Sequence, residues 1–302
     1  MKTELNFLEL HFLIEELQEL IGGRIDNIYQ PNGLILQIHK SGKGKQLLQI
    51  TDKAMFLAKE KPETEKPTAL CSTLRKYLKG KKITEIKQIN SERIAKITLQ
   101  TQKEKFHLFI ELFSNGNMVL TDENQKILAA KEERAWKDRE IRRGKTYQLP
   151  PQKQNLFELT EVPKEEKELA SAGFGKLLAK EIIARGSYRE LLKEKKNPRI
   201  YSDGEMSPIK LEQYKETGKT YKTFSEILDK YLTKNLQTKK EEKASRAYEQ
   251  KRAKMQEIID VQTKTKEEQE KKAIEQQRKG ELIYEHYQEL KEILEEINKA
   301  KA

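Results

Sequence analysis

The sequence predicts an α+β protein in which an antiparallel sheet is followed by a small helical region and a long charged helix. Apolar and polar residues alternate through residues 95–100 and 106–112, and this period of two is typical of strands in a sheet. Apolar residues recur every three or four positions between residues 5 and 21, which indicates an amphipathic helix. From residue 235 onward the chain is rich in Lys, Glu, Gln and Arg and lacks proline, which favours one extended helix.

We expect the central part of the sheet between residues 89 and 128, with one of its two faces packed. Asn115 and Gly116 tolerate a positive φ and predict a tight turn between two strands, and residues 122–126 predict a second turn. Glu92 and Arg93 lie at the mouth of this sheet, where the first strand begins. Neighbours on a regular strand point to opposite faces, so this pair would converge only at an irregular strand start.

Shorter elements are expected before this part of the sheet. The first helix ends at Gly22-Gly23, and Thr68 is placed to cap a second helix that runs to Lys79. The exposed side of the second helix carries Arg75, Lys76 and Lys79, which form either a solvated surface or a set of phosphate contacts. The strands are expected at residues 24–29, 34–39, 46–50 and 55–57, and the inward residues of the second helix are Leu70, Leu74, Tyr77 and Leu78.

An irregular basic segment is expected at residues 136–151. It contains three candidate phosphate contacts, Arg142, Arg143 and Lys145. We expect Trp136 to be a packing residue. A base-stacking role is the alternative, and it requires that the indole ring be exposed.

The next region is expected to be smaller and mostly helical. Gly173, Gly175 and Lys176 lie in a turn between two helices, and this pattern is typical of a helix–hairpin–helix whose backbone amides face a phosphate group. A plain interhelical turn would have the same pattern. We divide the chain into domains at residues 1–160, 161–234 and 235–302.

The charged helix is expected to be one arm of a coiled coil. If residues 235–297 formed one straight rod, its length would be on the order of 90 Å. Clean heptads are not sustained along it, although an apolar stripe lies near its end. The stripe consists of Leu282, Ile283, Tyr287, Leu290, Leu294 and Ile297.

Charge and composition narrow the classes of function. The 302 residues carry a formal net charge of +11, which favours a polyanionic partner such as nucleic acid over a membrane surface. Cys71 is the only cysteine, so an intrachain disulfide and a cysteine-based metal site are excluded. The four histidines lack the spacing of a metal pair, and no nucleotide-binding loop or nucleophile motif is present. We expect a cytoplasmic binding protein without a cofactor or metal, and not an enzyme.

The order of motifs along the chain resembles the NFACT family, which comprises the RqcH and nuclear export mediator proteins of ribosome-associated quality control, once labelled fibronectin-binding proteins. The resemblance covers essentially the whole chain and depends on an ordered set of short motifs. These motifs are residues 22–29, 66–68, 74–78, 92–94, 111–113, 116–117, 120–122, 139–144, 147, 150–151, 173–175, 207–209 and 224–231.

The resemblance implies a fold and a function. The N-terminal domain would be similar to the N-terminal fold of formamidopyrimidine-DNA glycosylase, followed by a helix–hairpin–helix domain and a coiled coil. The protein would bind a large ribosomal subunit obstructed by peptidyl-tRNA, contact its rRNA, hold tRNA and support template-free addition of residues to the stalled chain. The functional residues of the family fall on Glu9, Glu92 and Arg93, and both acidic positions carry Glu where the family usually has Asp.

The family continues through a returning coiled-coil arm into a further RNA-binding domain. We therefore expect either a cut chain or a naturally split protein, whose separate C-terminal NFACT subunit would pair with the charged helix.

Two rival functions come from other functional classes. A coiled-coil adaptor for protein partners is one. A DNA glycosylase is the other, and it is disfavoured because Lys2 stands where that enzyme family has its proline nucleophile.

Overall fold

The computed structural model of this protein describes residues 4–31, 33–61, 66–151, 154–216 and 218–301. The chain forms two compact units, Met1–Leu236 and Gln237–Ala302, which are described separately below. The strands are β1 (Arg24–Tyr29), β2 (Leu34–Lys40), β3 (Gly44–Ile50), β4 (Met55–Ala58), β5 (Lys82–Gln88), β6 (Ile94–Gln100), β7 (Lys105–Glu111), β8 (Asn117–Asp122), β9 (Ile127–Ala130), β10 (Arg134–Ala135), β11 (Glu140–Ile141), β12 (Lys196–Ile200), β13 (Met206–Ile209) and β14 (Lys219–Thr220). The α-helices are α1 (Phe7–Leu17), α2 (Ala69–Leu78), α3 (Glu166–Leu169), α4 (Gly175–Arg185), α5 (Tyr188–Leu192), α6 (Phe224–Leu228), α7 (Lys234–Glu285) and α8 (Tyr287–Lys301).

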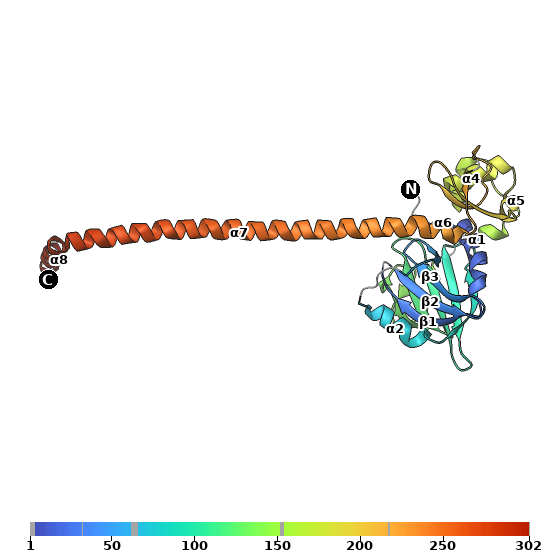
Figure 1. Ribbon diagram of the computed structural model, residues 1–302, viewed down its shortest axis with the longest axis horizontal. Coiled ribbons are helices and arrows are strands. Elements are labelled where there is room, and N and C mark those ends of the chain that lie inside the picture. Colours follow the sequence, from blue (N-terminus) through green and yellow to red (C-terminus); the bar gives the residue numbers. More distant parts are fainter. Residues whose placement is uncertain (1–3, 32, 62–65, 152–153, 217, 302) are drawn as a thin grey trace. The chain divides into compact units, whose positions relative to one another are not determined.

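A nine-stranded antiparallel sheet dominates the first unit (Figure 1). Its strand order is β4-β3-β2-β1-β5-β6-β7-β8-β9, so two meanders meet where β1 pairs with β5. The strands expected at residues 24–29, 34–39, 46–50 and 55–57 are present with boundaries that differ by at most two residues. The prediction missed β5, in which a register shift between Ile83 and Glu85 interrupts the alternation of buried and exposed side chains.

The prediction of a single packed face is wrong, because both faces of the central strands are covered. The inward series of β6 and β7, which includes Ile97 and Leu108, belongs to the main core. The opposite face packs a second cluster in which Phe109 and Val119 meet Ile141 and Tyr147 from the following segment. Phe109 stacks on Tyr147 with ring centroids 4.2 Å apart. Sequence alternation cannot reveal this second layer, because the residues that cover it come from outside the sheet.

The first two helices close the main core. Helix α1 begins with a capping box, in which the Asn6 side chain accepts a hydrogen bond from the Glu9 amide and the Glu9 carboxylate accepts one from the Asn6 amide. Its α-helical part ends at Leu17, and a 3₁₀ turn continues to Leu20, so the helix is shorter than the predicted 5–21. Helix α2 has Thr68 as its N-cap, as predicted.

Helix α2 buries Leu74 and Leu78 as expected, and it also buries Cys71. The other two residues predicted to face inward, Leu70 and Tyr77, are only partly buried and pack against the edge of the core. The inward face of α2 is therefore narrower than its apolar pattern suggests.

Residues 156–232 pack onto the same unit. They contain a second small sheet, with strand order β13-β12-β14, in a region predicted to be mostly helical. Leu10 and Leu13 of α1 belong to the main core, whereas Phe7 and Phe12 belong to a cluster with residues from α4 and α5. Helix α1 is thus shared by two apolar clusters, and one of them spans the boundary that we predict near residue 160.

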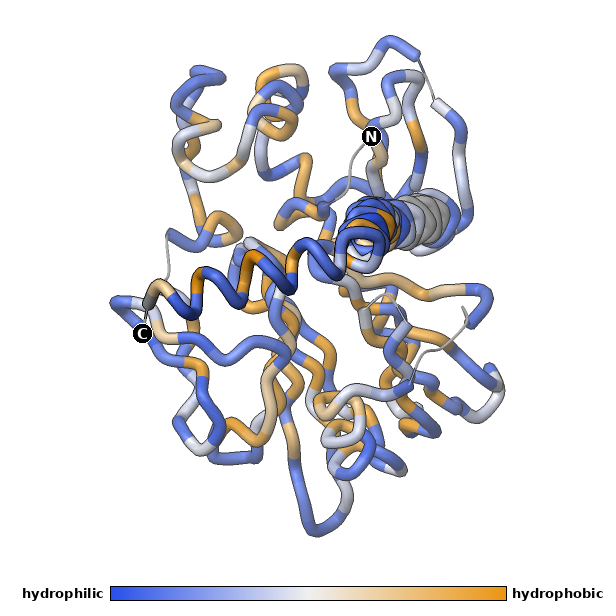
Figure 2. Tube along the Cα trace, turned by 90° about the vertical axis from the view of Figure 1, so that its left-hand side faces the viewer, coloured by the Kyte–Doolittle hydropathy of each residue, from blue (hydrophilic) through white to orange (hydrophobic). Residues whose placement is uncertain are grey.

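The second unit is helical. The helix breaks at His286, so residues 235–297 do not form one rod. Both α7 and α8 expose large apolar side chains, and Figure 2 shows apolar positions recurring along the helix that ends at the C-terminal label. Among these side chains, Ile258 is 56% exposed and Leu294 is 58% exposed. No helix among the described residues is both long and apolar enough to span a membrane.

Candidate nucleic-acid interface

A cavity of about 730 Å³ in the first unit brings together two sets of residues that the sequence singled out separately. One set is Glu92 and Arg93, and the other is the glycine turn of Gly173, Gly175 and Lys176. About 80 residues of sequence separate them. The remaining lining residues are Glu4, Leu5, Asn6, Phe7, Ser91, Phe113, Gln154, Leu156, Ala172, Phe174, Leu177 and Glu205.

Glu92 and Arg93 lie in the turn that leads from β5 into β6. The turn is irregular, and Asn90 adopts a positive φ of 48° within it. The Gln88 side-chain amide donates to the carbonyl oxygens of Glu92 and Phe7, each at 2.9 Å. Gln88 therefore ties the turn to the first residue of α1, and this places both side chains on the cavity wall.

The carboxylate next to Arg93 belongs to Glu4. The Arg93 Nη1 atom lies 3.2 Å from Glu4 Oε2 and 3.4 Å from the Leu5 carbonyl oxygen. Lys53 Nζ donates to the same Glu4 oxygen at 2.9 Å, and this hydrogen bond together with Arg93 lowers the pKa of Glu4 below its ordinary value. The Arg93 side chain is 30% exposed, so its guanidinium can reach a ligand in the cavity. The sequence offered no signal for Glu4, which is far from Arg93 along the chain.

Glu9 lies behind the cavity wall. Its side chain is buried, and its carboxylate accepts the Asn6 amide at 2.9 Å in the capping box of α1. Asn6 and Phe7, the residues that this box fixes, line the cavity. A supporting position for Glu9 is therefore compatible with the structure, and its part in tRNA binding stays a prediction.

The glycine turn leads into α4. Gly173 has a φ of 110° and Gly175 a φ of 75°, a region that other residues adopt only with strain. Phe174 between them is buried in the cluster shared with α1, where its ring contacts Phe7 and Tyr188 edge-on. Phe174 anchors the turn, and the first three residues of α4, Gly175, the exposed Lys176 and Leu177, line the cavity. Amides at a helix N-terminus suit an anionic group.

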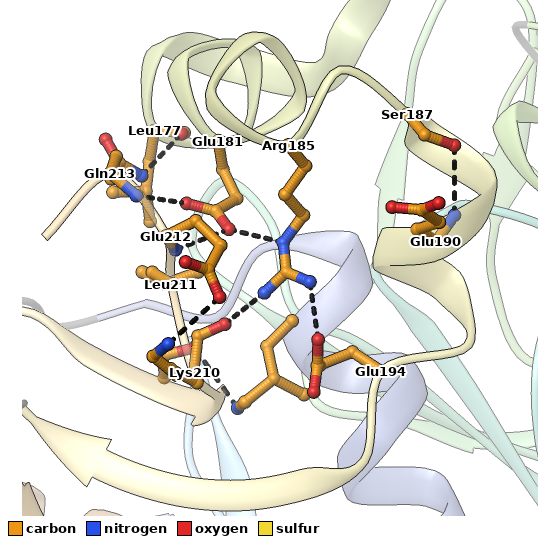
Figure 3. Close-up of polar contacts among 12 residues, drawn as sticks. Leu177, Glu181, Arg185, Ser187, Glu190, Glu194, Lys210, Leu211, Glu212 and Gln213 are labelled. Carbon is orange, nitrogen blue, oxygen red and sulfur yellow. Dashed lines mark hydrogen bonds and ion pairs between the residues drawn. The ribbon is translucent and has the colours of Figure 1, made fainter.

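A buried ion-pair network holds α4 in place (Figure 3). Arg185 Nε donates to Glu181 Oε1 at 2.5 Å, and the two side chains are 6% and 0% exposed. The Glu181 carboxylate also accepts the amides of Glu212 and Gln213 at 2.8 and 3.1 Å. Further contacts of Arg185 go to the Glu194 carboxylate and the Lys210 carbonyl oxygen. One helix and two loops are thereby fixed around a single guanidinium.

The other candidate phosphate contacts lie outside this cavity. Lys76 on α2 and Lys79 at its C-cap are exposed, whereas Arg75 is partly buried and donates from Nε to the Ile28 carbonyl oxygen at 2.6 Å. Arg75 therefore holds α2 against β1. In the other basic segment, Arg142, Arg143 and Lys145 are all exposed. Arg142 and Lys145 pair with Glu140 at 3.3 and 3.9 Å.

Sequence reasoning missed a buried polar cluster next to the cavity. Arg139 binds both oxygens of Glu111, at 2.7 and 3.0 Å, and the Tyr147 hydroxyl donates to Glu111 at 2.8 Å. Burial is the main cause that raises the pKa of Tyr147 well above its ordinary value. One feature of the sequence pointed to this cluster. Glu111 shares the outward face of its strand with His107 and Phe109, and aromatic rings are unusual on a face that is exposed to solvent.

The expectation that Trp136 is a packing residue is wrong, since this residue is 40% exposed.

Among the residues that the structure describes, no group of three or more His, Cys, Asp or Glu side chains is arranged to hold a metal ion. The cavity wall carries two cationic groups, the Arg93 guanidinium and the Lys176 ammonium group, together with the carboxylates of Glu4, Glu92 and Glu205. An anion would therefore bind at Arg93 or Lys176, where a charged donor is available.

One protein family and several known proteins are similar to this chain. Residues 6–302 match the family described as NFACT N-terminal and middle domains. The archaeal Rqc2 homolog aRqcH of Methanocaldococcus jannaschii is 27% identical over 361 residues, which cover 100% of this chain and 53% of that protein. Ribosome quality control complex subunit 2 of Saccharomyces cerevisiae is 32% identical over 155 residues, or 49% of this chain and 14% of that protein. The chain thus spans about half the length of the archaeal relative.

Solved structures share the fold. The N-terminal part of the fibronectin/fibrinogen-binding protein from Streptococcus suis superimposes with a TM-score of 0.69 at 23% identity, covering 76% of this chain and 100% of that one. The fibrinogen binding protein from Staphylococcus aureus gives a TM-score of 0.64 at 24% identity, covering 75% of this chain and 98% of that one. The chain therefore belongs to the NFACT family, as a homologue of the Rqc2 and RqcH proteins of ribosome quality control that matches their N-terminal part.

Proposed function

We propose that this chain is the N-terminal part of a ribosome-associated quality control factor that binds an obstructed large ribosomal subunit and holds tRNA. Family membership supports the pathway, and the relatives whose names refer to ribosome quality control support the ribosomal partner. The observation that carries the tRNA assignment is the cavity, because it unites Glu92 and Arg93 with the glycine turn at α4.

Arg93 is the residue that we propose to contact tRNA directly. A guanidinium offers five N–H donors and a flat face, so it can bind a phosphate or stack on a base. Lys176 and the amides at the start of α4 would bind a neighbouring phosphate group. The Glu4 carboxylate would hold Arg93 in place in the absence of RNA, since its oxygen lies 3.2 Å from Nη1. This role is one of binding, without bond-making by the chain itself.

The helical unit would act as a coiled-coil arm. Its exposed apolar residues support pairing with another helix, either the returning arm of the family or a separate C-terminal NFACT subunit. These residues also favour the rival function, a coiled-coil adaptor for protein partners. The two functions differ in their response to salt and RNase, because ribosome binding through phosphate contacts is lost at high salt and after RNase treatment.

Substitution of Arg93 tests the assignment. We expect Arg93→Ala to lower tRNA affinity by about tenfold, since a hydrogen bond to a charged group contributes about 1.5–3 kcal/mol. Binding is measured by fluorescence anisotropy with labelled tRNA across a salt series, alongside co-sedimentation with purified large ribosomal subunits. Arg24→Ala is the matched control, because Arg24 is an exposed cation that does not line the cavity.

Equal affinities for Arg93→Ala and the wild-type chain at every salt concentration would overturn the tRNA assignment. A chain that binds neither tRNA nor large subunits at low salt would overturn the proposed function as a whole. Thermal unfolding of each variant, followed by circular dichroism, separates a loss of contact from a loss of fold.

A further inference from the structure

We propose that Trp136 is a stacking platform for an unpaired RNA base at the edge of the cavity. This inference rests on the proposed function, because it takes RNA as the partner. It adds a second contact site and defines the kind of RNA that this site accepts, namely a single-stranded nucleotide and not a duplex. No part of the family resemblance assigns a role to this residue.

The indole ring is exposed but not loosely held. Trp136 begins the turn of the hairpin formed by β10 and β11, and its amide donates to the Arg139 carbonyl oxygen at 2.8 Å. The Arg139 guanidinium lies 4.9 Å from the centre of the indole ring. Arg139 is in turn fixed by two hydrogen bonds to buried Glu111, which also accepts the Tyr147 hydroxyl. An exposed ring is thus supported by a buried, hydrogen-bonded cluster.

This arrangement suits a base better than a protein side chain. Trp136 is 40% exposed, and bases stack on aromatic rings with little regard to sequence. The guanidinium of Arg134 also lies 5.5 Å from the centre of the indole ring, so a stacking base would replace this group or lie beside it. Between residues 131 and 145 there are seven basic and four acidic residues, so the surroundings favour phosphate groups. Two of the acidic residues pair with exposed arginines, Glu132 with Arg134 at 3.9 Å and Glu140 with Arg142 at 3.3 Å, and such exposed pairs contribute little and exchange readily for phosphate.

Trp136 is also adjacent to the proposed tRNA site. The Arg139 guanidinium that faces the indole ring lies 5.9 Å from the centre of the Phe113 ring, and Phe113 lines the cavity. One guanidinium therefore contacts an aromatic ring of the cavity wall and the exposed indole. An RNA strand whose phosphate is bound near Arg93 could extend one or more nucleotides to Trp136.

Fluorescence of this residue provides a direct test, because Trp136 is the only tryptophan in the chain. We expect a single-stranded RNA oligonucleotide to quench the emission at saturation, because a base that stacks on the indole ring contacts the emitting group directly. Inorganic polyphosphate of matched charge binds the same basic surface and should leave the emission nearly unchanged. Binding of each probe is followed independently by competition with labelled tRNA.

Substitutions test the energetic part of the inference. We expect Trp136→Ala to weaken binding of the single-stranded RNA by about tenfold, and Trp136→Phe to recover part of this loss, because stacking on an aromatic side chain strengthens binding by factors of this order. Tyr248→Ala is the matched control, since Tyr248 is an aromatic residue with 71% exposure on α7.

Three outcomes would overturn the inference. In the first, the RNA binds without quenching, and the Trp136→Ala variant binds it as tightly as the wild-type chain does. This outcome would not affect the proposed tRNA site at Arg93. In the second, polyphosphate quenches as strongly as RNA, so that charge and not stacking explains the signal. In the third, no RNA binds at low salt, which overturns the proposed function as well.

Discussion

At the scale of single residues, His107 shows how burial on the second face of the sheet changes chemistry. Its side chain is buried, and its Nδ1 atom lies 3.2 Å from the Thr98 hydroxyl. Desolvation is the main cause that lowers the pKa of His107 to about 4, and Lys96, Lys105 and Lys87 act in the same direction against Glu85. The imidazole is therefore neutral in the folded protein at physiological pH.

The free energy of unfolding should depend on this residue below neutral pH. Between pH 6.5 and about 4 the unfolded chain binds a proton at His107 that the folded chain does not, so stability is lost as the pH falls through this range. We expect the loss between pH 7.5 and pH 5 to be about 2 kcal/mol smaller in His107→Gln than in the wild-type chain. Urea unfolding at the two pH values measures this difference.

The control for this prediction is His286→Gln, because His286 lies exposed at the junction of α7 and α8. This variant shows how far the removal of an exposed histidine by itself changes the pH-dependent loss of stability. If His107→Gln showed the same loss as the wild type, the buried neutral imidazole would not be a source of acid sensitivity.

At the scale of elements, the position of α4 depends on the network around Arg185. Both side chains of its central ion pair are almost fully buried, and the Glu181 carboxylate also accepts two loop amides. Removing one partner of such a pair leaves the other buried and uncompensated. The network fixes the C-terminal half of α4, and the buried Phe174 anchors the turn before its first residue.

We expect Glu181→Gln to lower the free energy of unfolding by about 3 kcal/mol, because breaking a buried pair costs about 3–5 kcal/mol. The double substitution Glu181→Met and Arg185→Met should cost less than either single substitution, since it leaves no buried charge. Urea unfolding gives these free energies.

Glu275→Gln is the control, because Glu275 pairs with Lys279 on the exposed surface of α7. This substitution should change the free energy of unfolding by less than about 0.5 kcal/mol. Equal effects of Glu181→Gln and Glu275→Gln would rule out the network as a major source of stability.

At the scale of the whole molecule, the positive charge is concentrated in the first unit. Residues 237–302 carry 16 Lys and Arg against 15 Asp and Glu, so ten of the eleven net positive charges lie in residues 1–236. Binding to polyanions should follow this distribution. The helical unit contributes length and exposed apolar side chains, and almost no net charge.

A chain that ends at Leu236 should therefore keep its tRNA affinity within about twofold and show an unchanged dependence of affinity on salt concentration. The first unit contains the apolar clusters and the cavity, so we expect this shorter chain to fold by itself. Fluorescence anisotropy with labelled tRNA over a salt series compares the two chains. A large loss of affinity, or a shallower salt dependence, would assign part of the RNA contact to the helical unit.

The sequence by itself determined the features that depend on neighbouring residues. The alternation in residues 95–112 predicted β6 and β7, and Thr68 predicted the start of α2, because strand pairing and helix capping follow local periodicity and local hydrogen bonds. Gly173 and Gly175 predicted a turn between two helices for the same reason. The ordered motifs were sufficient to identify the family.

The tertiary structure alone decided which distant residues meet. It paired Arg93 with Glu4, placed the glycine turn in the same cavity, covered the outer face of the sheet and left Trp136 exposed. Gly116 is a further example, because a Cβ atom there would lie 2.4 Å from the Asp52 backbone, in a different turn. Such contacts depend on the packing of segments that are far apart along the chain, and no local pattern of residue types encodes them.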